Sequence, residues 1–298
     1  MMRRGLALLF ATITVGPAGW LASSPPAGAD QTTAISAPLK VCSAADELPY
    51  SNEKLEGFEN RIAVVIGEEL RRPIEHVWWK DPRFYIRDLL EAGACDITIG
   101  IDAGNPRVLS SQPYYRSGYV FIYRKDKGIS ISDWNSPILK TATIAVVPGT
   151  PAETMLKQID RYYELFNYLM SLVDYKSRRN QYVKYDPARL VQEVISGRAD
   201  VAVLWGPSAA RYVRQSSIPL EMVMIPDRAT RTDGEPVPHH YDTSLGVRKE
   251  DQGLLNQLND ALVRRRGEIE TILKAEGIPA LPLTSNRLTA AEGGVAQR

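Results

Sequence analysis

The feature that most constrains the fold is a regular alternation of two hydrophobic patterns between residues 39 and 101. Short, continuously apolar segments are typical of buried parallel strands, and they alternate with amphipathic segments of helical period. The predicted elements in order are strand 39–43, helix 59–71, strand 74–78, helix 83–91 and strand 96–101. This β-α-β-α-β order predicts an α/β fold with a parallel sheet.

A second set of alternating elements follows. Strands are predicted at residues 118–124, 143–147, 200–204, 221–225 and 243–248. The pair Asp186-Pro187 is typical of a helix start, because the acid can cap the helix and proline fits its first turn. Gly197 is typical of the end of the same helix. Two amphipathic helices are predicted before Gly277 and Pro279.

The first 29 residues have the pattern of a cleavable export signal. Arg3 and Arg4 precede an apolar stretch of about eleven residues, which is too short to span a bilayer. The small residues 27–29 predict a cleavage site, so the mature chain should begin at Asp30 in the periplasm; an uncleaved anchor is the alternative. The polar residues 284–298 are predicted to form a flexible tail.

The charge balance disfavours two classes of partner. The full chain carries 36 Lys and Arg residues against 35 Asp and Glu residues. Removal of the signal leaves 34 cations against 35 acids, a net charge of about −1. Such a near-neutral chain gives no electrostatic case for binding nucleic acid or an anionic membrane surface. No further long apolar segment predicts a transmembrane helix.

Two cysteines are present, Cys42 within a predicted strand and Cys95 just before another. An even number of cysteines in an oxidising compartment favours a disulfide, and neighbouring parallel strands would bring this pair within bridging distance. Two separate buried thiols are the alternative. A metal pair is less favoured, because neither cysteine has a second Cys or His ligand nearby.

Three positions after predicted strands are candidates for ligand contact. Gly149-Thr150 leads into a helix whose N–H groups can hold an anion, although Pro151 removes one donor; an ordinary turn is the alternative. Arg107 could grip an anion at the edge of the sheet or form a surface salt bridge. Trp205 could wall a cleft or simply pack.

Catalytic and cofactor motifs are missing from the sequence. The three histidines, His76, His239 and His240, show no zinc-binding spacing. There is no Walker loop, no G-x-S-x-G elbow and no G-x-G-x-x-G turn. We therefore expect no enzymatic activity, no cofactor and no metal site.

Several short segments follow one another in a specific order between residues 39 and 280. They include Leu48-Pro49-Tyr50-Ser51, Gly57-Phe58-Glu59-Asn60, Cys95-Asp96, Pro113-Tyr114-Tyr115-Arg116-Ser117 and Leu204-Trp205-Gly206-Pro207. In these segments the chain resembles the type II periplasmic solute-binding proteins of the amino-acid-binding kind. Within that superfamily it is similar to the J-type proteins of the methanol oxidation system, periplasmic accessories of PQQ-dependent methanol dehydrogenase.

This resemblance implies a two-lobed type II periplasmic binding protein fold with two crossover hinge segments. Residues 30–125 plus 237–283 would form lobe 1, and residues 126–236 would form lobe 2. The resemblance also implies a binding function without catalysis.

The same resemblance assigns roles to residues of the cleft and reveals departures from them. Tyr50 matches the aromatic residue that stacks on ligand, and Arg107 matches the arginine that binds the ligand's carboxylate. In amino-acid binders an acid usually lies where Trp205 falls, and it takes the ligand's ammonium. Pro151 replaces a residue whose N–H helps to hold the carboxylate. Half of an amino-acid site is therefore kept and half is lost.

We therefore expect a non-catalytic accessory that contacts methanol dehydrogenase transiently. Aromatic and arginine side chains dominate binding hot spots. The predicted ligand- or partner-binding residues at the cleft edge are Tyr50, Trp79, Arg107, Tyr115, Thr150 and Trp205. The Tyr-rich stretch 162–185 is a second candidate surface. The alternatives are a transporter-linked carrier of a small ligand and an enzyme on the same fold.

Overall fold

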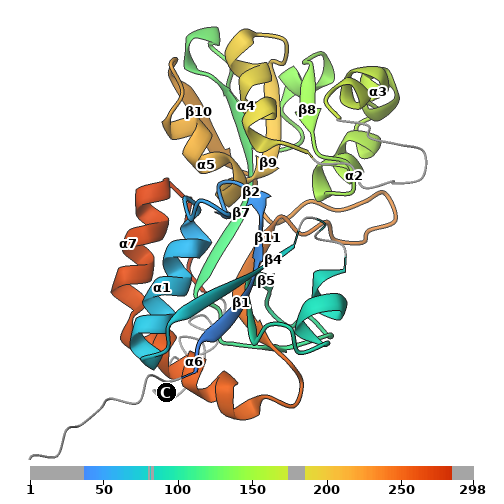
Figure 1. The fold of residues 1–298 in the computed structure, drawn as a ribbon. Coiled ribbons are helices and arrows are strands. Elements are labelled where there is room, and N and C mark those ends of the chain that lie inside the picture. Colours follow the sequence, from blue (N-terminus) through green and yellow to red (C-terminus); the bar gives the residue numbers. More distant parts are fainter. Residues whose placement is uncertain (1–36, 80, 82–83, 174–184, 284–298) are drawn as a thin grey trace, which may run out of the picture. The chain divides into compact units, whose positions relative to one another are not determined.

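The computed structural model describes residues 37–79, 81, 84–173 and 185–283 (Figure 1). The chain divides into two units, Met1–Ile35 and Ser36–Arg298, and all described residues belong to the second. The predicted signal peptide 1–29 and the predicted tail 284–298 lie outside the described residues, so both stay predictions.

The first alternating elements form close to their predicted positions. They are β1 (Leu39–Ala44), α1 (Phe58–Leu70), β4 (Ile74–Trp79) and β5 (Ile97–Asp102), with the short strands β2 (Asp46–Glu47) and β3 (Ser51–Asn52) between β1 and α1. The predicted helix 83–91 is a π-helical turn, Ile86–Leu90, and Arg83 lies outside the described residues.

The central sheet is mixed, which corrects the prediction of a parallel sheet. Its remaining strands are β6 (Leu109–Ser110), β7 (Tyr115–Arg124), β8 (Ile144–Val146), β9 (Val201–Trp205), β10 (Leu220–Met224) and β11 (His240–Val247). The strand order is β4-β1-β5-β11-β7-β9-β8, with β10 paired to β7 and β6 to β11. β1 runs parallel to β4 and β5, whereas β11 is antiparallel to β5 and β7. The returning strand β11 carries no local signal of its direction, which explains the error.

Local signals in the sequence mark some of the later helices, and α4 most clearly. The later helices are α2 (Pro151–Gln158), α3 (Tyr162–Ser171), α4 (Pro187–Ser196), α5 (Gly206–Arg214), α6 (Gln252–Arg264) and α7 (Arg266–Glu276). The Asp186 side chain accepts a hydrogen bond from the Ala188 amide at 2.9 Å, and Gly197 ends α4 with φ 76°. Helix α5 was not predicted, although Pro207 lies in its first turn.

Two large hydrophobic cores lie along the sheet. The first core is built from residues 120–237 and centres on Phe121, Ile122 and Ile144. The second core combines residues 39–115 and 245–278 with Ala210. Full burial of each large apolar side chain stabilises the fold by roughly 1.5–3 kcal/mol.

Helix α5 belongs to both cores. Its residue Ala209 is buried in the first core, and the next residue, Ala210, is buried in the second. The helix packs on β7, β9 and β10 and also contacts α7 (Figure 1). The strand before α5 therefore ends where the two cores meet. The predicted lobe boundaries near residues 125 and 237 stay a prediction.

The predicted disulfide between Cys42 and Cys95 is present. The two Cα atoms are 5.5 Å apart, and β1 pairs in parallel with β5, so Cys42 lies opposite Thr98. The bridge is buried in a small third cluster with Leu90 and Ile101. It ties β1 to the chain just before β5, because Cys95 lies two residues before that strand.

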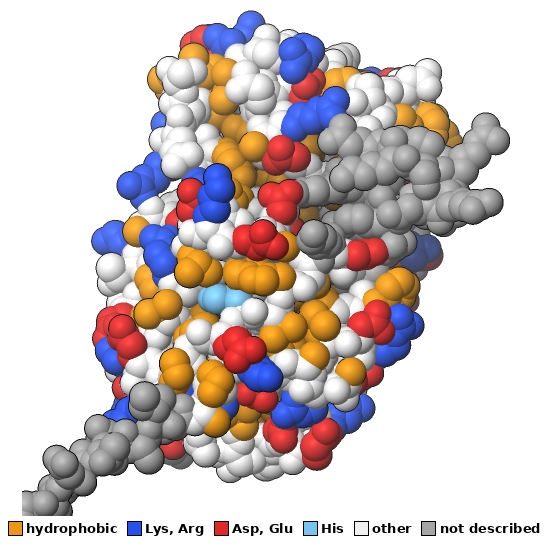
Figure 2. All heavy atoms as spheres, viewed as in Figure 1, with side chains coloured by type: hydrophobic (Ala, Val, Ile, Leu, Met, Phe, Trp, Pro, Cys, Tyr) orange, Lys and Arg blue, Asp and Glu red, His pale blue; other side chains and the backbone are white. Residues whose placement is uncertain are grey.

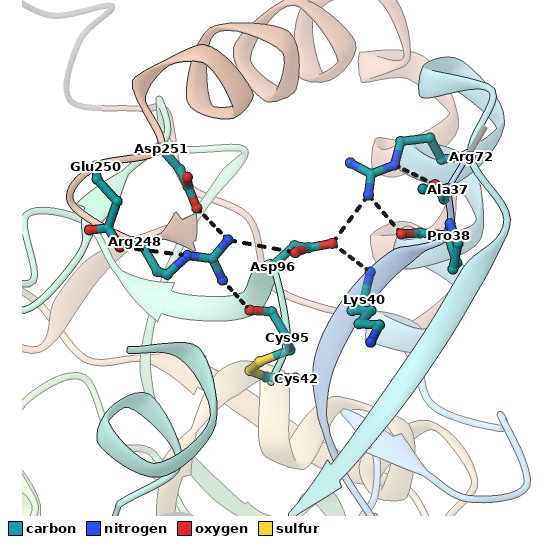
Figure 3. A network of polar contacts seen from close by, with 10 residues as sticks. All are labelled: Ala37, Pro38, Lys40, Cys42, Arg72, Cys95, Asp96, Arg248, Glu250 and Asp251. Carbon is teal, nitrogen blue, oxygen red and sulfur yellow. Dashed lines mark hydrogen bonds and ion pairs between the residues drawn. A yellow bond between two sulfur atoms is a disulfide. The ribbon is translucent and has the colours of Figure 1, made fainter. Parts of the chain in front are cut away.

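A network of charges surrounds Asp96, the residue that follows the disulfide (Figure 3). Asp96 Oδ2 accepts hydrogen bonds from the Lys40 amide at 3.0 Å and from Arg72 Nη2 at 3.2 Å. Arg248 approaches Asp96 Oδ1 at 3.6 Å and donates to the Cys95 carbonyl at 2.5 Å. One carboxylate thus links the start of β1, the turn after α1 and the segment after β11.

Candidate functional site

Five aromatic side chains lie where the two cores meet, and we call them the aromatic cluster. The members are Tyr50, Tyr115, Tyr119, Trp205 and Tyr241. The ring centroids of Tyr119 and Trp205 are 5.6 Å apart, those of Trp205 and Tyr241 5.9 Å, and those of Tyr119 and Tyr241 6.3 Å. All three pairs are tilted or edge-to-face, the arrangements that aromatic rings prefer.

The position of Trp205 follows from the strand that precedes it. The first four residues of β9 are buried in the first core, and Trp205 is the last residue of the strand and the N-cap of α5. The β7–β9 register places Tyr119 directly opposite Trp205, so their side chains lie on the same face of the sheet. Yet the Trp205 ring packs against the second core. This residue therefore joins the two cores.

The tyrosine hydroxyls of the aromatic cluster are uncharged at physiological pH. Burial raises the pKa of Tyr115, while hydrogen bonds from the Thr243 and Trp205 side chains partly offset the effect. Burial likewise raises the pKa of Tyr50 well above its ordinary value, and a hydrogen bond with Ser208 opposes the shift. The cluster therefore offers apolar rings and neutral hydroxyls, and contributes no charge of its own.

A carboxyl group that the sequence analysis did not assign to the site lies beside this cluster. Burial raises the pKa of Glu59 well above its usual value, and the nearby Glu47 raises it further. Glu59 in turn raises the pKa values of Tyr50 and Tyr115. Gly100, with φ 79°, leaves room for this group, because a Cβ atom there would overlap Glu59 Oε1. In the sequence, Gly57-Phe58-Glu59 indicated the family resemblance but gave no sign that the Glu59 carboxyl group lies beside the aromatic cluster.

The structure places Trp79 and Arg107 apart from this group of contacts. The Trp79 ring stacks on Tyr85 with centroids 4.1 Å apart and packs against the small third cluster. Arg107 forms an exposed ion pair with Glu91, with Nη2–Oε2 2.8 Å and Nε–Oε1 3.1 Å. This ion pair corresponds to the surface salt bridge that the sequence left open. The binding roles of both residues stay predictions.

Thr150 is the N-cap residue of α2, and it lines a cavity that no member of the aromatic cluster borders. Its hydroxyl donates to the Val147 carbonyl at 2.6 Å, and the Gly149 amide donates to Glu153 Oε2 at 2.6 Å. A backbone donor of the predicted anion site is therefore already used within the chain. The cavity, about 450 Å³, is also lined by Lys157 and Arg231. Of the predicted site residues, only Tyr50, Tyr115 and Trp205 come together.

The described part of the chain offers neither a metal centre nor a membrane-spanning helix. Across those ranges, no three His, Cys, Asp or Glu side chains gather in a way that suits a metal ion. None of the described helices combines the length and hydrophobicity that crossing a bilayer requires.

The mixed sheet, the two cores and the aromatic cluster between them describe the part of the chain that a known family also matches. The chain belongs to the bacterial extracellular solute-binding proteins, family 3, which match it over residues 39–275. This membership confirms the predicted fold class.

Particular relatives narrow the resemblance further. The chain is 48% identical over 249 residues to the protein MoxJ of Methylorubrum extorquens AM1, covering 83% of each chain. It is similar to the crystal structure of MxaJ from Methlophaga aminisulfidivorans MPT, with 49% identity, a TM-score of 0.79, and coverage of 82% of this chain and 100% of that one. It is also similar to the crystal structure of the periplasmic binding protein XoxJ from Methylobacterium extorquens AM1, with 28% identity and a TM-score of 0.59. That match covers 82% of this chain and 99% of the other. These similarities confirm the predicted resemblance to J-type proteins.

Proposed function

We propose that this protein is a non-catalytic periplasmic accessory of PQQ-dependent methanol dehydrogenase, acting in its assembly, maturation or activation. The observation that carries the proposal is the environment of Trp205. The resemblance to amino-acid binders implies that Trp205 replaces an acid of those proteins, and its ring contacts Tyr119 and Tyr241. An indole cannot accept the charge-assisted hydrogen bond that an ammonium group requires. A protein that keeps the solute-binding fold but lacks an acceptor for the ligand's ammonium group suits a role in binding another protein.

The composition of the aromatic cluster supports a protein partner. Tyrosine and tryptophan are enriched at binding hot spots because their rings bury a large area and their polar atoms can still pair. We propose Tyr50, Tyr115 and Trp205 as the residues through which the partner is held. Figure 2 shows acidic and basic side chains interspersed over the visible face. Such a surface gives little long-range steering, which supports a transient contact.

The cellular location is proposed on three grounds. The first 29 residues have the pattern of an export signal. The family consists of extracellular solute-binding proteins, and the similar XoxJ is described as a periplasmic binding protein. The Cys42–Cys95 disulfide suits an oxidising compartment. N-terminal sequencing of the exported protein should give Asp30, and a mature protein that retains Arg3 and Arg4 would contradict the proposed cleavage.

We also propose that the two cores correspond to two lobes, residues 30–125 plus 237–283 and residues 126–236. The support is that the first core is built from residues 120–237 and the second mainly from residues outside that range. Two crossings of the chain would permit hinge motion between the lobes. Hydrogen exchange should show different protection for the two sets of residues. If amide protection were the same in both sets of residues, with no change near residue 125 or residue 237, the division into two lobes would be contradicted.

A second candidate function is that of a transporter-linked carrier of a small ligand. The cavity of about 450 Å³ beside Thr150, with Lys157 and Arg231 in its wall, favours this alternative. Calorimetry against common amino acids distinguishes the two functions. We expect no submicromolar binding, because an unpaired buried ammonium costs several kcal/mol and each 1.4 kcal/mol changes affinity tenfold. A submicromolar dissociation constant would favour the carrier.

The partner proposal is tested by binding to purified methanol dehydrogenase, both loaded with PQQ and free of it. The wild-type protein should bind at least one form, and Trp205→Ala should weaken that binding roughly tenfold or more. Tyr163→Ala is the matched control, because this residue is 83% exposed on α3, within the second candidate surface. Loss of binding with Tyr163→Ala alone would place the contact on that second surface. Absence of binding to either form up to about 100 μM would refute the partner proposal.

A further inference from the structure

Three arginines line a cavity outside the aromatic cluster. Arg61 comes from α1, and Arg211 and Arg214 come from α5. The cavity measures about 410 Å³, and its other lining residues are Leu55, Glu56, Gln215, Ala275 and Glu276. Because Arg211 and Arg214 are three positions apart on one helix, their side chains lie on the same face of α5. The cavity therefore concentrates positive charge from two helices.

One buried carboxylate serves two of these arginines. Glu276, whose side chain is 7% exposed, pairs with Arg61 and also with Arg211, whose Nε and Nη2 lie 2.7 and 2.8 Å from its oxygens. Arg211 Nη2 also donates to the Glu56 carbonyl at 2.9 Å. In the described part of the chain, the Nη1 groups of Arg61 and Arg211 donate no hydrogen bond. Each guanidinium has five N–H donors, so both keep unused donors.

The third arginine has no acceptor among the described residues. Arg214 is exposed, and its Cδ would lie 3.7 Å from a Cβ placed on Gly277, so its stem lies beside the end of α7. The other acid in the wall, Glu56, is held elsewhere, because its Oε2 accepts a hydrogen bond from Asn52 Nδ2 at 2.6 Å. The cavity thus contains three cations and two acids, and both acids already have partners.

Arg211 and Arg214 both lie in the last turn of α5, but that position does not explain why they share a cavity with Arg61. A cation near a helix C-terminus gains roughly 0.3–1 kcal/mol from the helix dipole wherever its side chain points. That gain does not require Arg214 to share a cavity with Arg61, which is held on another helix. Glu276 lies between Arg61 and Arg211 and offsets their mutual repulsion, but no described acid pairs with Arg214. Guanidinium groups bind carboxylate and phosphate through paired N–H donors.

We propose that this cavity binds a small organic anion, whose carboxylate or phosphate group is held by Arg214 and by the free donors of Arg61 and Arg211. Leu55 and Ala275 supply an apolar wall for the remainder of the ligand. Because α5 carries residues of both cores and α1 lies on the second, the bound anion links the two. The ligand therefore stabilises the folded protein. This site is separate from the aromatic cluster and does not depend on the proposed partner.

The proposal is tested with the complete exported protein and two probes, citrate and inorganic phosphate, at constant ionic strength set with sodium chloride. Calorimetry measures affinity, and thermal unfolding measures the stabilisation that binding causes. At least one probe should bind the wild-type protein and raise its Tm. Arg214→Gln should weaken that binding roughly tenfold or more, because a charge-assisted contact is lost. Arg214→Lys should keep part of the affinity, since the charge remains but the paired donors do not.

A matched control separates a specific site from the effect of net charge. Lys249→Gln removes the same charge from an exposed residue outside the cavity wall, and it should leave the affinity unchanged. Far-ultraviolet circular dichroism should show that both variants fold, because neither side chain forms a hydrogen bond or ion pair in the described structure. The proposal is overturned if neither anion binds, if Arg214→Gln binds as tightly as the wild type, or if Lys249→Gln loses as much affinity as Arg214→Gln.

Discussion

The two cores of this protein are assembled in different ways. The first is built from one continuous stretch of the chain, residues 120–237. The second joins residues 39–115 to residues 245–278 across the whole of that stretch. Bringing distant segments together costs more loop-closure entropy, although the cost rises only slowly with length. The second core therefore has more need of additional ties.

Three such ties are found at the second core or at its border with the first. The Cys42–Cys95 disulfide joins β1 to the chain just before β5. Asp96 links three segments of the same half of the sheet, and Trp205 brings the end of β9 onto the second core. If this comparison is right, removing a tie should weaken the second core more than the first.

The largest effect is expected from removing the disulfide. The double variant Cys42→Ala/Cys95→Ala should lower the free energy of unfolding by roughly 3–4 kcal/mol, because a loop of about fifty residues is no longer closed in the unfolded chain. Urea unfolding measures the loss, and hydrogen exchange should locate it in β1, β4 and β5. A loss below about 1 kcal/mol, or equal loss of protection in both cores, would contradict the comparison.

A smaller effect is expected at the junction. Trp205→Ala should cost roughly 2–3 kcal/mol, less than a fully buried tryptophan, because its side chain is only partly buried. Trp205→Phe should retain most of the stability, since it keeps an aromatic ring against Tyr119 and Tyr241. Thermal and urea unfolding of both variants provide the measurement. If alanine and phenylalanine destabilise equally, the ring contacts do not hold the cores together.

The Asp96 network should contribute less than the disulfide. Asp96→Asn keeps the size of the side chain but removes the charge that faces Arg72 and Arg248, and we expect a loss of roughly 1–2 kcal/mol. The measurement is urea unfolding at low and high salt. Because these charges are only partly buried, salt should reduce the difference from wild type. A variant as stable as wild type at both salt concentrations would show that the network is not a tie.

Glu59 predicts a dependence of stability on pH. Its pKa is raised in the folded protein, so the unfolded chain loses this proton first as pH increases from about 4.3. The contribution of Glu59 to stability is therefore complete below that pH and is lost as pH rises through the folded pKa. Glu59→Gln should gain stability relative to wild type between pH 5 and about pH 8. A constant difference in Tm across this range would contradict the predicted shift.

The smallest effect is expected at Arg107. Its ion pair with Glu91 is exposed, and such pairs contribute about 0–1 kcal/mol. Arg107→Gln should therefore unfold almost like the wild type, in contrast to Asp96→Asn. A loss larger than that of Asp96→Asn would show that exposure is a poor guide to the value of charges in this protein.

Local signals in the sequence predicted much of the fold. Asp186, Pro187 and Gly197 mark the ends of α4 because capping depends on residues only a few positions apart. The pairing of Cys42 with Cys95 was also predicted, because an even number of cysteines in an oxidising compartment favours a disulfide and the two lie on or beside neighbouring parallel strands. Each of these inferences relied on neighbours in the chain or on a common topology.

The features that escaped prediction depend on contacts between distant residues. For Arg107 the sequence left a ligand contact and a surface salt bridge open, and it could not name the partner, because Glu91 lies sixteen positions away in the chain. The environment of Glu59 depends on the absence of a side chain at Gly100, on a strand some forty residues away. The convergence of Arg61 and Arg214 depends on how α5 meets the second core. None of these relations leaves a pattern in the local sequence.

We propose that this protein serves methanol dehydrogenase, and a deletion strain of the bacterium that encodes it tests this most directly. The quantity to measure is methanol dehydrogenase activity per amount of dehydrogenase polypeptide in the periplasm. We expect the polypeptide to be present but inactive or poorly assembled, and the wild-type gene to restore activity. A strain lacking the protein that makes fully active methanol dehydrogenase at normal levels would contradict the proposed function.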